Sequence, residues 1–130
     1  FIGLVFTSTP NVAAIVAKLS NPFALPKYVD PQNLNGKVYD TFAYPFNELW
    51  TSGVANDYNS LISKVPEYKT IVIGYSIGGA MASLASDIIS QRFTGGEINS
   101  ANLELYTFGA PRIGDMKYAM AHDQLVTPFL

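Results

Sequence analysis

The sequence contains no cysteine and a single histidine, His122. The lack of cysteine excludes disulfides and thiolate metal sites, and one histidine excludes a multi-histidine metal centre. No apolar run approaches the length that crosses a bilayer. With a net charge of −2, the chain offers no basic stripe for nucleic acid. We therefore expect no metal, no cofactor, no nucleic-acid partner and no transmembrane segment.

Apolar residues make up 48% of the 130 residues, which is typical of a globular chain with a real core. The length allows one domain at most. The chain begins at Phe1 inside an apolar run and ends at residues 127–130 without capping character. We therefore expect residues 1–130 to be part of one domain that is truncated at both ends. Any signal peptide would lie upstream.

The most informative stretch runs from Thr70 to Ala85. The β-branched residues 71–73 predict a buried strand, and residues 77–91 predict a helix. Between them stands Gly74-Tyr-Ser-Ile-Gly78, a G-x-S-x-G pattern with a strand before it and a helix after it. That context is the one a nucleophile elbow requires, with glycines where the turn leaves no room for a side chain. Ser76 is therefore the candidate nucleophile.

The start of this helix indicates a second candidate catalytic group. The first amides of a helix have no partner within it, and the helix dipole adds partial positive charge there. The Ile77 amide could therefore stabilise an oxyanion. The alternative interpretation is a serine in an ordinary turn between a strand and a tightly packed helix.

The remaining pattern alternates strands and helices. Strands are expected at residues 1–6, 36–42, 68–75 and 102–108, and helices at residues 12–19, 45–65 and 115–121. Pro45 is expected in the first turn of the long helix, Gly53 is a weak point in it, and Pro66 ends it. Residues 21–36 are expected to form a long irregular loop. The alternation predicts an α/β fold with a mostly parallel sheet.

Two segments resemble the class 3 (fungal-type) triacylglycerol lipases. Residues 74–85 resemble their elbow, G-H-S-L-G-G-A-x-A-x-L-A, and residues 106–115 resemble their Y-T-F-G-x-P-R-V-G-N/D segment. Residues 5–9 are similar to the family strand that ends in F-R-G-T/S. The resemblance implies a partial α/β-hydrolase fold, a mostly parallel sheet flanked by helices. It also implies hydrolysis of carboxylic esters, typically acylglycerols. A cutinase or general esterase is the nearest enzymatic alternative.

The resemblance also implies residue roles. Ser76 matches the nucleophile, the Ile77 amide one oxyanion donor, and Thr9 the hydroxyl residue that supplies the other, while Gly74 and Gly78 match the elbow glycines. Tyr75 replaces the usual histidine, and Thr7-Ser8 replace Arg-Gly. The family's aspartate and histidine lie beyond Leu130, so the residues given are expected to be inactive alone.

The partner implied by the resemblance is an acylglycerol or another lipid ester, with transient contact at a lipid interface. Residues 21–36 could border the acyl pocket or form a lid, although an ordinary connecting loop is the alternative. Family resemblance favours secretion. A non-catalytic remnant that serves as a lipid-binding or interaction module is the competing function.

Four other polar residues are explained more simply by structural roles. His122 is expected to be a non-catalytic histidine at the surface or at the end of a helix. Asp87 is expected on the solvated face of the elbow helix. Asp115 is expected to cap the last helix, and Arg112 to anchor its loop by pairing with a carboxylate.

Overall fold

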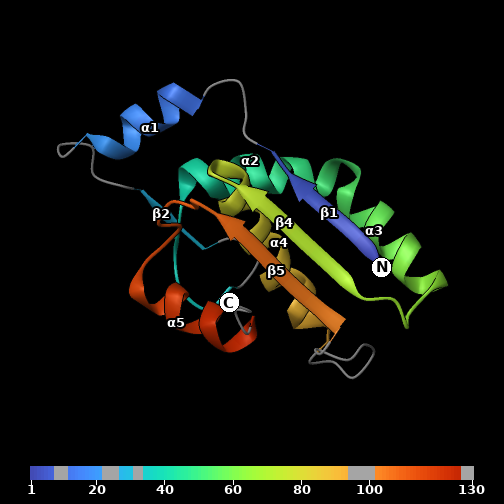
Figure 1. Cartoon of the computed structure of the whole chain (residues 1–130). Coiled ribbons are helices and arrows are strands. Elements are labelled where there is room, and N and C mark those ends of the chain that lie inside the picture. The colour runs from blue at the N-terminus through green and yellow to red at the C-terminus, as the bar shows by residue number, and fades with distance from the viewer. Residues whose placement is uncertain (8–11, 22–26, 31–33, 94–101, 127–130) are drawn as a thin grey trace.

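A computed structural model describes residues 1–7, 12–21, 27–30, 34–93 and 102–126 (Figure 1). The described helices and strands follow one another along the chain as β1 (Ile2–Phe6), α1 (Val12–Ser20), β2 (Tyr28–Val29), β3 (Val38–Tyr39), α2 (Asp40–Leu49), the π-helix η1 (Trp50–Val54), α3 (Ala55–Lys64), β4 (Thr70–Tyr75), α4 (Ile77–Phe93), β5 (Leu103–Phe108) and α5 (Met116–Leu125).

The main sheet has three described strands in the order β1-β4-β5, all parallel. β4 lies in the middle, with Val72 opposite Leu4 on one side and Leu105 on the other. Parallel neighbours need a crossover connection. Helices α1 to α3 lie between β1 and β4 in the chain, and α4 connects β4 to β5. The α/β fold with a mostly parallel sheet is confirmed.

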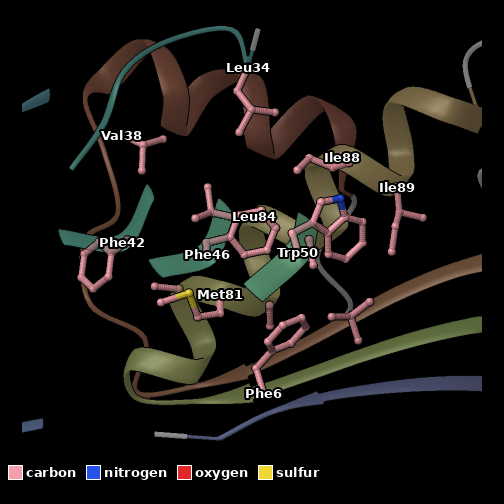
Figure 2. Packing of buried hydrophobic residues seen from close by; sticks show 14 of the residues in the cluster. Phe6, Leu34, Val38, Phe42, Phe46, Trp50, Met81, Leu84, Ile88 and Ile89 are labelled. Atoms are coloured by element: carbon pink, nitrogen blue, oxygen red, sulfur yellow. The ribbon is translucent and has the colours of Figure 1, made fainter. Parts of the chain in front are cut away.

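One face of this sheet is covered by helices and contains the core. In Figure 1, α4, α2 and α3 lie behind the sheet. Every residue of α4 from Ile77 to Ser90 is buried. Small side chains along α4 let it pack closely between the sheet and the outer helices. Figure 2 shows large core side chains gathered on this side of the strands: Phe6, Phe42, Phe46, Trp50, Met81 and Leu84.

The opposite face of the sheet is open among the described residues. Alternate residues of the strands point to this face, and four of them are large and exposed: Val5 (68%), Tyr75 (66%), Phe108 (58%) and Tyr106 (37%). Parallel sheets are normally covered on both faces, so this open face is unusual for the architecture.

The helical stretch before the sheet's central strand differs from expectation. α2 begins at Asp40, so Pro45 lies inside the helix and not in its first turn. The preceding turn is retained because Phe42 and Ala43 are packed in the core. Gly53 has a φ of 154° inside η1, which separates α2 from α3. The expected weak point at Gly53 is confirmed, whereas the prediction of one continuous helix from residue 45 to 65 was wrong.

A small second sheet joins the expected loop to the strand expected at residues 36–42. β2 pairs with β3 in antiparallel register, with Tyr28 opposite Tyr39 and their rings stacked 4.9 Å apart. β3 also bridges to Gly114. Residues 21–36 are therefore not wholly irregular, and residues 22–26 and 31–33 lie outside the described part of the chain.

Candidate active site

The candidate site is the turn between β4 and α4. Ser76 separates the last residue of β4 from the first residue of α4. Its φ is 54°, and it is the only non-glycine residue with positive φ in the described chain. This left-handed conformation costs an L-residue roughly 1–2 kcal/mol. A strained backbone held by its surroundings is typical of functional turns.

The two flanking glycines make this turn possible. A Cβ on Gly74 would collide with the carbonyl oxygen of Gly78, and a Cβ on Gly78 would collide with the carbonyl oxygen of Phe6. Both obstacles are backbone atoms, which cannot move aside as a flexible side chain would. The third glycine, Gly79, lies against Ala110, whose Cβ would be 2.8 Å from an added one. The turn therefore packs against β1 and against the loop after β5.

Hydrogen bonds hold the turn from both sides. The Ser76 amide donates to the Phe108 carbonyl over 2.8 Å, and the Gly79 amide donates to the Ser76 carbonyl over 2.9 Å. The Ser76 side chain is half-buried at the carboxyl end of the central strand, and the neighbouring Tyr75 is exposed. This end of an open parallel sheet is where α/β proteins bind ligands.

The arrangement at α4 also bears on the predicted oxyanion donors. Ile77 is the first residue of α4, so its amide belongs to the group that has no intrahelical partner. The other predicted donor, Thr9, lies outside the described residues. Thr7 is described and exposed, and its carbonyl carbon would be 3.1 Å from a Cβ on Gly78. The end of β1 therefore reaches the elbow.

A second polar site lies farther along α4, and it corrects the expectation for Asp87. Asp87 is 1% exposed and does not face solvent. Its Oδ2 accepts a 2.7 Å hydrogen bond from the Tyr118 hydroxyl, and its Oδ1 lies 2.6 Å from His122 Nδ1. We call Asp87, Tyr118 and His122 the α4–α5 polar cluster. A buried carboxyl group needs such partners because losing its hydration is costly.

His122 is expected at the surface or at a helix end, and the position at the helix end is confirmed. It lies in the last turn of α5, but its side chain is 20% exposed and stacks on Tyr118. Burial lowers the pKa of His122, while the hydrogen bond and charge of Asp87 raise it, and the net result is a raised pKa. Burial, with the nearby Asp87 charge, also raises the pKa of Tyr118, which keeps the phenol protonated as a donor.

The loop between β5 and α5 contains the last two candidates. Asp115 caps α5, since its side chain accepts from the Tyr118 amide over 2.8 Å, and this prediction is confirmed. Arg112 donates through Nε to the Gly114 carbonyl over 3.0 Å. Among the described residues the only ion pairs are Lys69–Glu104 and His122–Asp87, so the expected carboxylate pairing of Arg112 was wrong.

Two features of the sequence could have indicated the polar cluster. Asp87 is the one charged residue in the otherwise apolar and small stretch from residue 77 to 90. Tyr118 and His122 are four residues apart, which places them on one face of a helix. A lone acid in a buried helix indicates an internal partner.

Within the described ranges, no three His, Cys, Asp or Glu side chains gather where they could hold a metal ion. Likewise, none of the helices described is long and apolar enough to cross a membrane.

A tight strand–serine–helix turn at the carboxyl end of a parallel sheet defines this chain as an α/β-hydrolase-like protein. The family described as "Lipase (class 3)" matches residues 4–130. The chain belongs to the class 3 lipase family.

Individual relatives agree with this assignment. A lipase of Rhizomucor miehei is 34% identical over 118 residues, which cover 91% of this chain and 31% of the relative. The crystal structure of a lipase from Rhizopus microsporus var. chinensis superposes with a TM-score of 0.77 at 26% identity, covering 95% of this chain and 41% of that one.

A third relative is a solved structure described as showing that a serine protease triad forms the catalytic centre of a triacylglycerol lipase. It superposes with a TM-score of 0.75 at 28% identity, covering 95% of this chain and 44% of that one. This chain therefore spans 31% to 44% of the length of these three relatives.

Proposed function

We propose that the polypeptide containing this chain hydrolyses carboxylic esters of the acylglycerol type, with Ser76 as its nucleophile. The observation that carries this proposal is the backbone of Ser76, held at positive φ between two glycines that cannot bear a side chain. The relatives are named lipases, and one of them is described as having a serine protease triad. Residues 1–130 would then be part of a single α/β-hydrolase domain.

In this mechanism the Ser76 Oγ attacks the ester carbonyl carbon, and its proton passes to a histidine base. The carbonyl oxygen becomes an oxyanion that accepts a hydrogen bond from the Ile77 amide. By family resemblance the Thr9 hydroxyl is the second donor. Collapse of the intermediate releases the alcohol, which takes the proton from the histidine. Water then cleaves the acyl-enzyme by the same steps and releases the fatty acid.

The base in this mechanism is not His122. Asp87 lies eleven positions after Ser76 along α4, which corresponds to about 16 Å of helix. His122 is bonded to Asp87 and so lies beyond hydrogen-bond reach of the Ser76 hydroxyl. The base and its orienting acid would come from residues outside 1–130. A serine without its base is a weak nucleophile, so we expect these residues to be inactive alone.

The test is labelling of the full-length polypeptide with a fluorophosphonate, which reacts with activated serines. We expect a single adduct on Ser76, and the Ser76→Ala variant should lose both the adduct and ester hydrolysis. Ser63→Ala, which removes an exposed hydroxyl on α3, is the matched control and should label normally. A folded full-length protein that gives no adduct would instead support the non-catalytic remnant, a lipid-binding or interaction module.

A further inference from the structure

Two segments leave the elbow in different directions and meet again at Asp87. The first is α4, which starts directly after Ser76 and contains Asp87. The second starts at Phe108, whose carbonyl accepts from the Ser76 amide, and continues through the loop into α5. α5 provides Tyr118 and His122, which both contact Asp87. The elbow is thus connected to the polar cluster by two routes, one along α4 and one through the loop and α5.

The loop of residues 109–114 is tied to β3, because the Tyr39 amide donates to the Ile113 carbonyl over 2.9 Å and the Asp115 amide donates to the Lys37 carbonyl over 2.9 Å. It touches the elbow through Ala110, which lies against Gly79. Its far end is held by Asp115, which caps α5 and accepts from the Lys37 amide over 3.1 Å. The orientation of α5 toward α4 is set by hydrogen bonds to a carboxyl group that is 1% exposed.

We propose that Asp87 is a positioning residue of the elbow, which keeps α5 and the loop of residues 109–114 in the place that holds Ser76 in its strained conformation. This inference rests on the proposed role of Ser76. Asp87 touches no reacting atom and acts through Tyr118, His122 and the loop.

The same geometry makes the support depend on pH. The groups that face the imidazole are Asp87 from α4, and Tyr118 and Asp123 from α5, while Arg112 and Asp115 line the same surface pocket. The folded-state pKa of His122 is raised. Its contribution to stability is therefore fully present below the ordinary histidine pKa, about 6.5, and is lost as the pH rises through the raised value.

The experiment measures backbone hydrogen exchange in the full-length protein for wild type, Asp87→Asn and His122→Gln. Asparagine has nearly the shape of aspartate but cannot pair with an imidazolium, and glutamine keeps a neutral donor that does not titrate. We expect exchange in residues 76–79 and 109–114 to speed up about tenfold in Asp87→Asn, as for the loss of one charge-assisted hydrogen bond. Glu48→Gln, at an exposed acid on α2, is the control and should stay within about twofold of wild type.

The pH profile separates positioning from general stability. Corrected for intrinsic exchange rates, wild-type protection of these segments should fall as the pH rises above about 6.5, and in His122→Gln this change should disappear. Faster exchange confined to α5, or the same pH profile in both proteins, would overturn the proposal. Should Asp87→Asn fail to fold, the His122→Gln profile still decides.

These outcomes are independent of the labelling experiment. A full-length protein without a Ser76 adduct would refute the proposed function, yet its exchange profile would still report whether Asp87 supports the elbow. Conversely, the wild-type protein could label normally on Ser76 while Asp87→Asn exchanges at the wild-type rate. That result would refute only the positioning role.

Discussion

The elbow and the α4–α5 polar cluster lie on the same helix but are specified in different ways. The elbow is built from six consecutive residues, Gly74–Gly79. A Cβ on Gly74 would meet the Gly78 carbonyl oxygen of the same turn, whereas a Cβ on Gly78 would meet Phe6 of β1. The cluster joins residues that are 31 and 35 positions apart. A local steric rule is visible in a short motif, whereas a long-range hydrogen bond depends on how two helices come together. Three substitutions test this contrast.

The largest effect is expected at the elbow. Gly78→Ala places a Cβ onto the Phe6 carbonyl oxygen, so β1 or α4 must shift. We expect a loss of about 3 kcal/mol or more in the free energy of unfolding, measured by denaturant titration. Gly3→Ala is the matched control, because its Cβ would meet only the Phe1 ring at an ordinary 3.5 Å. Equal effects of the two substitutions would contradict the steric account.

A smaller effect is expected at the cluster. Tyr118→Phe removes the donor to Asp87 Oδ2 and leaves a buried acceptor without its partner. The expected loss is about 2 kcal/mol. Tyr106→Phe removes an exposed hydroxyl that donates to Glu104, and should cost less than about 0.5 kcal/mol. Equal melting temperatures for the two variants would show that burial does not strengthen the contribution of the hydrogen bond to Asp87.

The smallest effect concerns the strain at Ser76. Ser76→Gly removes the strain of the positive φ, because glycine adopts this conformation readily, while Ser76→Ala keeps the strain. Glycine gains from the left-handed conformation but loses more chain entropy on folding. The glycine variant should therefore be more stable than the alanine variant by about 0.5–1 kcal/mol. An alanine variant as stable as the glycine variant would show that the turn stores no strain.

Two of the wrong predictions from the sequence share one physical cause, which is that partners distant in the chain changed a local preference. The pattern around Pro45 places it in a first turn, but burial of Phe42 and Ala43 extends α2 toward the N-terminus. Asp87 was assigned to solvent because its partners come from α5, which the sequence of α4 does not contain. A third error is local, because helical periodicity predicted one long helix and the non-helical backbone of Gly53 interrupts it.

The sequence by itself determined the α/β alternation, the strand and helix around the serine, and the two glycines that the turn requires. The alternation and the elements around the serine depend on side-chain period, and Gly74 meets the backbone of its own turn, so these features are local. The space at Gly78 is limited by Phe6 of β1, although the motif itself marks that glycine. Only the tertiary structure decided that Asp87 is buried against Tyr118 and His122 and that the loop after β5 supports Ser76. The reason is that burial and hydrogen-bond partners depend on the packing of whole helices against the sheet.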